Sequence, residues 1–593
     1  GFQTQTPAEG FPGYRGKGNY TGSIGLSNKG FLAQGNLKYL GASIDSEDII
    51  FRPDQMTASA ERFDLSEDRD GPVEVPQTVG YDVKIDWRPY VDSMYVRTEE
   101  KPFELFQDEN HTLKGLAILT PDGLKGNGDF AWDKGKLNSE LMSFGAFSTR
   151  ADTATLQILA LGSNDIAFDT RNVNVDLDFD EQKGKVKANG DQHSTTMPYN
   201  QYSTSLDEFD WDMKAETVTF KNEAGKLGTF TSIHPDQDSL RFDGATAFYD
   251  LKTNELKIGG VPYIQSCDAY IYTETGDIEI LPGGVMSKLK NAQIVADTLN
   301  KYHVINRATV TVKGRKDYRA SGFYEYNIGE REQEIEFKSI VGTRVGKGKR
   351  SEKRTVTRAT GQVDPEDRFY IDHKTEFRGE ISLNAENVNL TFDGFAKIDS
   401  PALPKAEWFS LSCEADKNNM FIEYNSPKNY EGSPLVTGIY LSKETARMYA
   451  RVMDDLAFRK DRPILVAKGA TKGLFKYNKA SDEFIFGDSL RVASNSPYNN
   501  IMTMSNQTGD IVAQGEISIG SGLQYMSLTT AGEIRTKMDQ SGTTLDGPAE
   551  VDLEVRLMAG VDLEVPDKLL KILITDLQSS SFNARPVDYQ KNG

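Results

Sequence analysis

Residues 240–280 read LRFDGATAFYDLKTNELKIGGVPYIQSCDAYIYTETGDIEI, and this stretch decides the fold class. Apolar residues occupy every second position, and the alternation is broken only by the polar clusters DLKTNE and TETGD. Strict alternation predicts half-buried strands, because successive side chains of a strand point to opposite faces. Asn, Asp and Gly in the clusters favour tight turns. The stretch therefore predicts two successive hairpins with no helix between them.

The same hairpin pattern recurs along the chain. It combines an aromatic or apolar residue, an Asp, Asn or Thr, a short polar turn and a second alternating run. Further copies are FAWDKGKLNSEL from Phe130, VDLDFDEQKGKVKA from Val175, FDWDMKAETVTF from Phe209, LFKYNKASDEFIF from Leu474 and TMSNQTGDIVAQ from Thr503. This recurrence indicates a repeating wall of strands.

A longer repeat contains these hairpins. YTGSIGLSNKGFLAQGNLKYLGASIDSEDIIF begins at Tyr20, and LKGLAILTPDGLKGNGDFAWDKGKLNSELMSF begins 93 residues later at Leu113. Both have Gly at the third position and end in Ser-acid-x-apolar-x-Phe, and shorter relatives begin at Phe377 and Gln514. Such repeats predict a stacked array in which each unit buries its apolar face on its neighbour. A string of separate β-sandwiches is the alternative, and the scarcity of linkers rich in Pro, Gly and Ser favours one continuous body.

We therefore expect an all-β fold, an elongated stack of short antiparallel strands and hairpins of β-solenoid or β-jellyroll type, with few short helices. The expected segments are repeat units at 1–112 and 113–230, a third repeat segment at 231–340, a basic loop at 341–365, further repeats at 366–545 and a strand-rich end at 546–593. Strands are expected over 284–303. Helices are expected at 442–461, where Ser442 can cap three apolar residues at helical spacing, and at 567–576. The chain starts without Met, so we expect it to be part of a longer protein.

Composition limits the classes of function. The chain has 593 residues, a net charge of −20, 38% hydrophobic residues and 52 glycines, which suits a thin, turn-rich β-structure. The negative charge argues against nucleic-acid binding, which requires a basic surface. With no apolar run of about 18 residues, we expect no membrane-spanning helix. Cys267 and Cys413 are expected to be buried free thiols, with a disulfide as the alternative.

The sequence holds no recognisable catalytic motif. None of the five histidines has metal-ligand spacing, and there is no G-x-S-x-G, P-loop or dinucleotide-binding pattern. We therefore expect no enzyme and no cofactor. One alternating trio, Asp176, Asp178 and Asp180, places three carboxylates on one strand face and is a candidate Ca²⁺ site, with an exposed strand face as the alternative.

Two further groups are candidate binding residues. The block TRVGKGKRSEKRTVTR could attract anionic lipid headgroups or phosphorylated sugars, or form a solvated hairpin loop; its cations are Arg344, Lys347, Lys349, Arg350, Lys353, Arg354 and Arg358. Aromatic residues of the hairpins would either line a groove or pack one rung on the next; they are Trp132, Trp211, Tyr249, Tyr272 and Tyr477.

The segment 239–326 resembles the OstA-like family of lipopolysaccharide-transport proteins. The similarity lies in LRFDGATAFYDLKTNELKIGG, CDAYIYTETGDIEI, NAQIVADTLNKYHVINRATVTV and ASGFYEYN. The resemblance implies a β-jellyroll or β-solenoid whose stacked strands form an apolar groove for acyl chains.

The whole chain also resembles large repeat proteins of Bacteroidota cell envelopes, in pieces such as NVNVDLDFDE, MPYNQY, SLDEFDWDM and NKYHVINR. That resemblance implies export to the periplasm, the outer membrane or the cell surface. It also implies O-glycosylation within Asp-Ser/Thr-apolar tripeptides, whose acceptors here are Ser93, Thr153, Ser239, Thr298 and Ser489.

The expected function is that of a non-enzymatic envelope protein. It would act as a β-repeat scaffold or bridge, or as a trough that conducts lipid or lipopolysaccharide within an outer-membrane complex. Its partners would be other envelope proteins, lipid or polysaccharide. The alternatives are a surface carbohydrate-binding or adhesion protein, and a β-helix enzyme acting on polysaccharide through carboxylates from distant strands.

Overall fold

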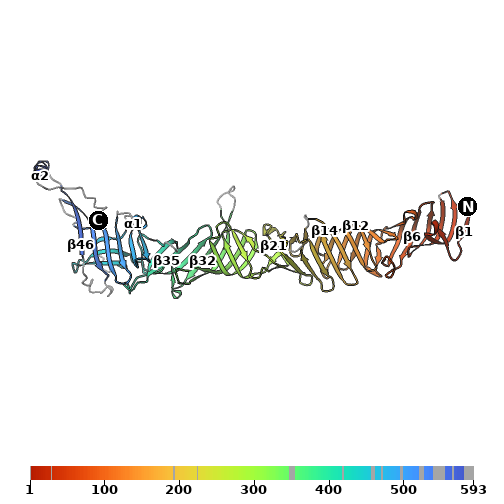
Figure 1. The fold of residues 1–593 in the computed structure, drawn as a ribbon, viewed down its shortest axis with the longest axis horizontal. Coiled ribbons are helices and arrows are strands. Elements are labelled where there is room, and N and C mark those ends of the chain that lie inside the picture. The colour runs from red at the N-terminus through yellow and green to blue at the C-terminus, as the bar shows by residue number, and fades with distance from the viewer. Residues whose placement is uncertain are drawn as a thin grey trace. The chain divides into compact units, whose positions relative to one another are not determined.

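The computed structural model describes residues 2–28, 30–190, 194–222, 225–345, 354–416, 420–455, 461–468, 472–494, 499–519, 526–538, 554–563 and 566–579. Strands hold 63% of the residues and helices 6%, which confirms the all-β prediction. The chain divides into two compact units: unit 1 comprises Gly1–Ile294 and Ala308–Arg319, and unit 2 comprises Val295–Arg307 and Ala320–Gly593. Within each unit the colours of Figure 1 follow the chain from one end to the other, although many hydrogen-bonded strands are not consecutive in the sequence.

Unit 1 consists of strands and short 3₁₀ turns. Its strands are β1 (Gln3–Gln5), β2 (Phe11–Gly13), β3 (Gly18–Ser27), β4 (Gly30–Tyr39), β5 (Ala42–Phe51), β6 (Met56–Leu65), β7 (Thr78–Arg88), β8 (Ser93–Thr98), β9 (Phe103–Leu105), β10 (Asp108–Thr120), β11 (Gly123–Trp132), β12 (Gly135–Phe144), β13 (Ser148–Leu159), β14 (Ile166–Asp178), β15 (Lys183–Ala188), β16 (Thr195–Met197), β17 (Tyr202–Thr204), β18 (Glu208–Asp212), β19 (Thr217–Lys221), β20 (Gly228–Ser232), β21 (Arg241–Gly244), β22 (Thr246–Asp250), β23 (Glu255–Gly259), β24 (Ile264–Ser266), β25 (Ala269–Tyr272), β26 (Ile278–Leu281) and β27 (Val285–Met286). The 3₁₀ turns are η1 (Tyr14–Gly16), η2 (Pro89–Val91), η3 (Pro235–Gln237) and η4 (Pro282–Gly284).

Three strands contribute residues to both units: β28 (Leu289–Ala296), β29 (His303–Gly314) and β30 (Asp317–Glu325). Unit 2 continues with β31 (Glu334–Val345), β32 (Arg354–Val363), η5 (Pro365–Asp367), β33 (Phe369–Tyr370), β34 (Thr375–Asn384), β35 (Leu390–Ile398), β36 (Phe409–Ala415), β37 (Ile422–Tyr424), β38 (Leu435–Leu441), β39 (Met448–Asp455), β40 (Arg462–Val466), β41 (Gly473–Asn478), β42 (Glu483–Asp488), α1 (Ser489–Ser494), β43 (Ile501–Ser505), β44 (Asp510–Glu516), β45 (Met526–Lys537), β46 (Glu554–Leu563) and α2 (Asp567–Ser579). No helix in the described part of the chain is long and apolar enough to cross a membrane.

The stretch that predicts the fold forms its two hairpins in two different rows of strands. Between β14 and β28 the chain alternates between rows: β15, β18, β19, β22, β23 and β26 pair in one series. The other series is β14, β16, β17, β20, β21, β24, β25 and β28. Hairpin β22–β23 therefore belongs to the first row and hairpin β24–β25 to the second.

The interior between these rows is filled with side chains. Alternate residues of both rows are fully buried, including Phe220 and Tyr249 in the first and Tyr202 and Phe230 in the second. The ring of Tyr249 lies 4.5 Å, centroid to centroid, from that of Phe168 on β14. Burial of one face of each strand is the main stabilising contribution to such a sheet.

The 93-residue repeat is visible in the backbone. Strands β4 and β5 have the same bounds as β11 and β12 after a shift of 93 residues. Gly22 pairs with Gly35 across β3 and β4, and Gly115 pairs with Gly128 across β10 and β11. Each pair brings two Cα atoms so close that a Cβ on Gly22 or Gly115 would lie 2.3 or 2.1 Å from the carbonyl oxygen opposite. Similar glycine pairs join β34 to β35 and β44 to β45.

In each copy of the repeat, a buried serine lies where the ladder of backbone hydrogen bonds is interrupted. Ser46 Oγ donates a hydrogen bond of 2.7 Å to the Ser59 carbonyl, and Ser139 Oγ donates one of 2.7 Å to the Thr153 carbonyl. Both hydroxyls also accept a hydrogen bond from the amide two residues later. The final Ser-acid element of the repeat therefore satisfies backbone groups where the ladder is interrupted.

The helix expected at 442–461 is wrong over 442–455, and residues 456–460 lie outside the described part of the chain. The segment contains a turn closed by the Ser442 amide donating to the Arg447 carbonyl, and then β39, which pairs with β38. The spacing of four residues between Met448 and Val452 is also a multiple of the strand period of two, so this pattern does not distinguish a helix from a strand. Met453 has a positive φ of 44°, and Val452 and Met453 are both buried, so the strand alternation is broken there. Cross-strand pairing overrides a weak helix preference here. The strands expected within 284–303 and the helix expected at 567–576 are confirmed as β27, β28 and α2.

Candidate apolar binding site

A cavity of about 1070 Å³ lies among the first strands of unit 1. Its walls come from β1, β2 and η1, from β3 and β4, and from the residues that follow β5. The apolar lining includes Phe2, Phe11, Ile24, Leu26, Phe31 and Phe51.

On the cavity side of β3, the described strands β1 and β2 pair with only part of the strand. Strand β3 is ten residues long, but β1 pairs only with Ser23, Ile24 and Gly25, and β2 only with Gly18, Asn19 and Tyr20. The apolar side chains around the uncovered part of β3 therefore stay accessible. Phe2 is 70% exposed, Phe11 59%, Leu26 55% and Phe31 48%.

An aromatic cluster closes the inner end of the cavity. The Tyr14 ring meets the buried Trp87 ring edge to face at 5.1 Å, and the Tyr20 and Phe51 rings lie 5.3 Å apart. Tyr14 Oη donates to the Arg52 carbonyl at 2.7 Å, and burial raises the pKa of Tyr14 to about 12. This hydroxyl is therefore neutral and already hydrogen-bonded, so it leaves the inner wall apolar.

Among the residues that the structure describes, Arg52 has the one charged side chain in the lining, and it is exposed. Pockets that bind small organic ligands have volumes of roughly 300–1,000 Å³ and mostly apolar walls with few polar groups. The lining also holds the polar side chains of Thr4, Gln5, Thr6 and Asn28, and the buried indole N–H of Trp87 has no hydrogen-bond partner in the described part of the chain, so its apolar character comes from the remaining residues. A ligand with many polar groups would lose more hydration along this apolar wall than it regains. The chemistry fits an elongated apolar chain whose polar end lies beside Arg52.

The five aromatic residues singled out in the sequence lie elsewhere. Trp132, Trp211 and Tyr249 are buried, and the two tryptophan rings lie 6.0 Å apart in the core, so they pack one rung on the next. Tyr272 is half-buried, 6.0 Å from the Tyr263 ring. Tyr477 donates its hydroxyl to Asp482 at 2.6 Å.

The cavity residues were missed because they do not belong to the hairpin pattern. Phe31, Leu32 and Ala33 are consecutive apolar residues at the start of β4, which interrupts the alternation. That interruption is the signal in the sequence that could have pointed to an apolar surface.

The three aspartates of the candidate Ca²⁺ site have cationic or backbone partners. Asp176 lies 3.1 Å from Arg150, Asp180 lies 3.8 Å from Arg69, and Asp178 accepts a hydrogen bond from the Glu181 amide at 2.8 Å. Among the residues that the structure describes, no group of three or more His, Cys, Asp or Glu is arranged to hold a metal ion.

Most of the basic block lies outside the described residues, namely Lys347, Lys349, Arg350 and Lys353. Arg344 and Arg354 are described only as backbone, in the paired strands β31 and β32. Arg358 is exposed on β32. Cys267 and Cys413 are half-buried and do not form a disulfide, and burial raises the pKa of Cys413 to about 12.

The acceptor residues of the five tripeptides are all at least partly accessible. Thr153 and Ser239 are exposed, whereas Ser93, Thr298 and Ser489 are half-buried. In two tripeptides the Asp has a left-handed conformation that closes a 3₁₀ turn begun by Pro: Asp92 after η2 and Asp238 after η3. The tripeptides at Asp92 and Asp238 therefore contribute to turn geometry, independently of any glycosylation of Ser93 or Ser239.

No family model, curated protein or solved structure matches this chain. The class that the structure defines is an all-β repeat protein, with an apolar cavity among its first strands. Function must therefore be argued from the residues themselves.

Proposed function

We propose that this protein is a non-enzymatic, exported β-repeat scaffold of the cell envelope that holds the acyl chain of an amphiphile among its first strands. The apolar cavity is the observation that carries the proposal. Its wall combines accessible apolar side chains with a hydroxyl, on Tyr14, that is already bonded to backbone carbonyls. Burying a flexible hydrocarbon chain there gains about 0.8 kcal/mol per CH₂ group, before the cost of ordering the chain.

The scaffold role is supported by the filled interior of the later rungs. Between β14 and β28 the inward residues of both rows are buried against one another, so their side chains serve packing. Such an array presents its outer faces and its ends to partners. We therefore assign acyl-chain binding to the first strands and a structural role to the rungs that follow.

Displacement of a fluorescent fatty acid tests the proposal. Leu26 lines the cavity and is 55% exposed, so Leu26→Asp puts a charge into the wall with little effect on folding. Leu141→Asp is the matched control, because Leu141 is 53% exposed on β12 and is not part of the lining. We expect the wild type and Leu141→Asp to bind the probe equally, and Leu26→Asp to bind at least tenfold more weakly.

Mass spectrometry of protein purified from the native envelope supplies the second measurement. We expect a co-purifying amphiphile with the wild type and its loss with Leu26→Asp. Equal probe binding by the two variants, or no lipid with any of the three proteins, would contradict the proposal.

A further inference from the structure

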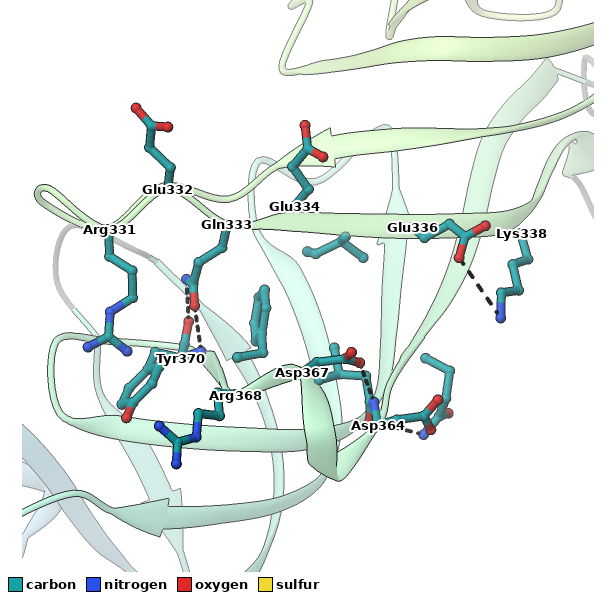
Figure 2. A pocket seen from close by; sticks show the side chains of 14 residues that line it. Arg331, Glu332, Gln333, Glu334, Glu336, Lys338, Asp364, Asp367, Arg368 and Tyr370 are labelled. Atoms are coloured by element: carbon teal, nitrogen blue, oxygen red, sulfur yellow. Dashed lines mark hydrogen bonds and ion pairs between the residues drawn. The ribbon is translucent and has the colours of Figure 1, made fainter.

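A polar groove of about 630 Å³ runs along β31 in unit 2. It is lined by the turn before β31, by the outward residues of that strand, by the end of β32 and by η5 with β33. Figure 2 shows Arg331, Tyr370 and Arg368 gathered at one end of the groove and Glu336 with Lys338 at the other. The charged residues at the second end, Glu336 and Lys338, form an ion pair, whereas those at the first end do not pair with a carboxylate among the described residues.

Arg331 stacks on the ring of Tyr370, and Tyr370 is itself fixed by hydrogen bonds to Gln333 and Asp399. Its guanidinium carbon lies 3.4 Å from the centre of the Tyr370 ring, and Tyr370 Oη donates to Asp399 Oδ2 at 2.9 Å. Gln333 binds both backbone groups of Tyr370: its Oε1 accepts from the Tyr370 amide at 2.8 Å and its Nε2 donates to the Tyr370 carbonyl at 3.1 Å. A guanidinium stacked on a fixed ring keeps its N–H edge free for a ligand and loses little entropy on binding.

Arg368 faces the same end from the opposite side. It has a positive φ of 45° and closes η5, where the Asp364 amide donates to Asp367 Oδ2 at 2.7 Å. Figure 2 shows its guanidinium extending past Tyr370. In the described part of the chain, neither Arg331 nor Arg368 forms an ion pair with a carboxylate, although both line the groove.

The carboxylates of the groove are largely engaged elsewhere. Glu334 bonds Arg307 at 2.5 Å, Glu336 lies 3.9 Å from Lys338, and Asp364 and Asp367 bind each other's backbone in the turn. Arg331 and Arg368 at the Tyr370 end therefore have no carboxylate partner among the described residues, although Glu332, Asp364 and Asp367 keep their negative charges, because hydrogen bonds to the backbone do not neutralise a carboxylate. Glu332 and Gln362 remain along the wall as hydrogen-bonding groups for hydroxyls.

We propose that this end of the groove binds the carboxylate of an acidic sugar, with Arg331 and Arg368 as its two ligands. A planar carboxylate accepts two parallel hydrogen bonds from a guanidinium fork, and the polar wall can hold the ring hydroxyls. A short sugar chain fits within the groove, which is bounded by the turn before β31 and by η5. The site is independent of the apolar cavity, which lies in unit 1.

Isothermal titration with trigalacturonic acid tests the assignment. We expect binding by the wild type, and a loss of at least tenfold in affinity for both Arg331→Gln and Arg368→Gln, because each removes a charged hydrogen-bond pair. Arg331→Lys keeps the charge but not the fork, so it should not restore affinity. Arg241→Gln is the control, because this substitution removes the same charge from an exposed residue of unit 1 that does not line the groove.

Two further probes separate the ligand chemistries. The methyl ester of trigalacturonic acid should not bind, because it lacks the carboxylate charge, and inorganic phosphate at the same concentration should not displace the acid. Binding of the ester, displacement by phosphate, or an equal loss in the Arg241→Gln control would each overturn the proposal. Thermal unfolding of each variant confirms that the exposed substitutions leave the fold intact.

Discussion

Replacing Gly115 by Ala tests the close backbone approach that defines the repeat. Gly115 has a φ of +150°, and an added Cβ would lie 2.1 Å from the Asn127 carbonyl oxygen and 3.1 Å from the Gly128 Cα. Both obstacles belong to the backbone of the neighbouring strand, so no side-chain rotation can relieve them. The two strands would have to separate where they form the ladder between β10 and β11.

The expected cost has two parts. An unfavourable backbone conformation costs about 1–3 kcal/mol, and forcing an extra methyl group into a close-packed contact costs about 1–3 kcal/mol. We therefore expect the local free energy of unfolding to fall by about 2–6 kcal/mol. Gly22→Ala should have a similar cost, because its Cβ would lie 2.3 Å from the Gln34 carbonyl oxygen in the preceding copy of the repeat.

Hydrogen exchange followed by mass spectrometry is the suitable assay. Repeat arrays unfold locally, so the effect should appear as faster exchange in peptides from β10 and β11. Gly190→Ala is the control, because an added Cβ there meets no atom within 4 Å. If Gly115→Ala exchanges as slowly as the wild type, the two strands do not approach as closely as the structure shows, and the repeat geometry is refuted.

Two other substitutions follow from buried polar contacts. His303 is fully buried, its Nε2 lies 2.7 Å from the Asn387 carbonyl oxygen, and burial lowers its pKa. The imidazole therefore takes up a proton more readily in the unfolded state than in the folded state. The free energy of unfolding should fall as the pH drops below about 6.5, by up to about 1.4 kcal/mol per pH unit. His303→Gln should remove this contribution to the pH dependence, as measured by equilibrium unfolding. Ser139→Ala leaves buried backbone groups unsatisfied and should cost about 1–3 kcal/mol, whereas Ser143→Ala, at an exposed position, should be neutral in thermal unfolding.

The alternation in residues 240–280 was sufficient to predict strands, because the side-chain period of a strand is a local property. It was not sufficient to predict their pairing. Strand β19 pairs with β22 and strand β23 with β26, so partners are separated by intervening strands of the other row. Pairing of this kind depends on which apolar faces meet in the core, and no local pattern specifies it.

The error at 442–461 has a similar origin. Met448, Val452 and Leu456 have helical spacing in the sequence, but β39 gains its hydrogen bonds from β38. A positive φ at Met453 then shifts the inward side of the strand by one residue. A spacing of four residues suits both a helix and a strand, and here only the pairing with the neighbouring strand distinguishes the two.

The sequence by itself determined the all-β class, the hairpin unit and the 93-residue repeat, because these depend on side-chain alternation, turn residues and glycines that are close in the chain. The tertiary structure decided where binding surfaces lie. The apolar cavity lies where β1 and β2 pair with only part of β3, and the groove exists because Gln333 holds Tyr370, 37 residues away, beneath Arg331. Coverage and long-range contact are properties of the packed strands, so no single segment of the sequence contains them.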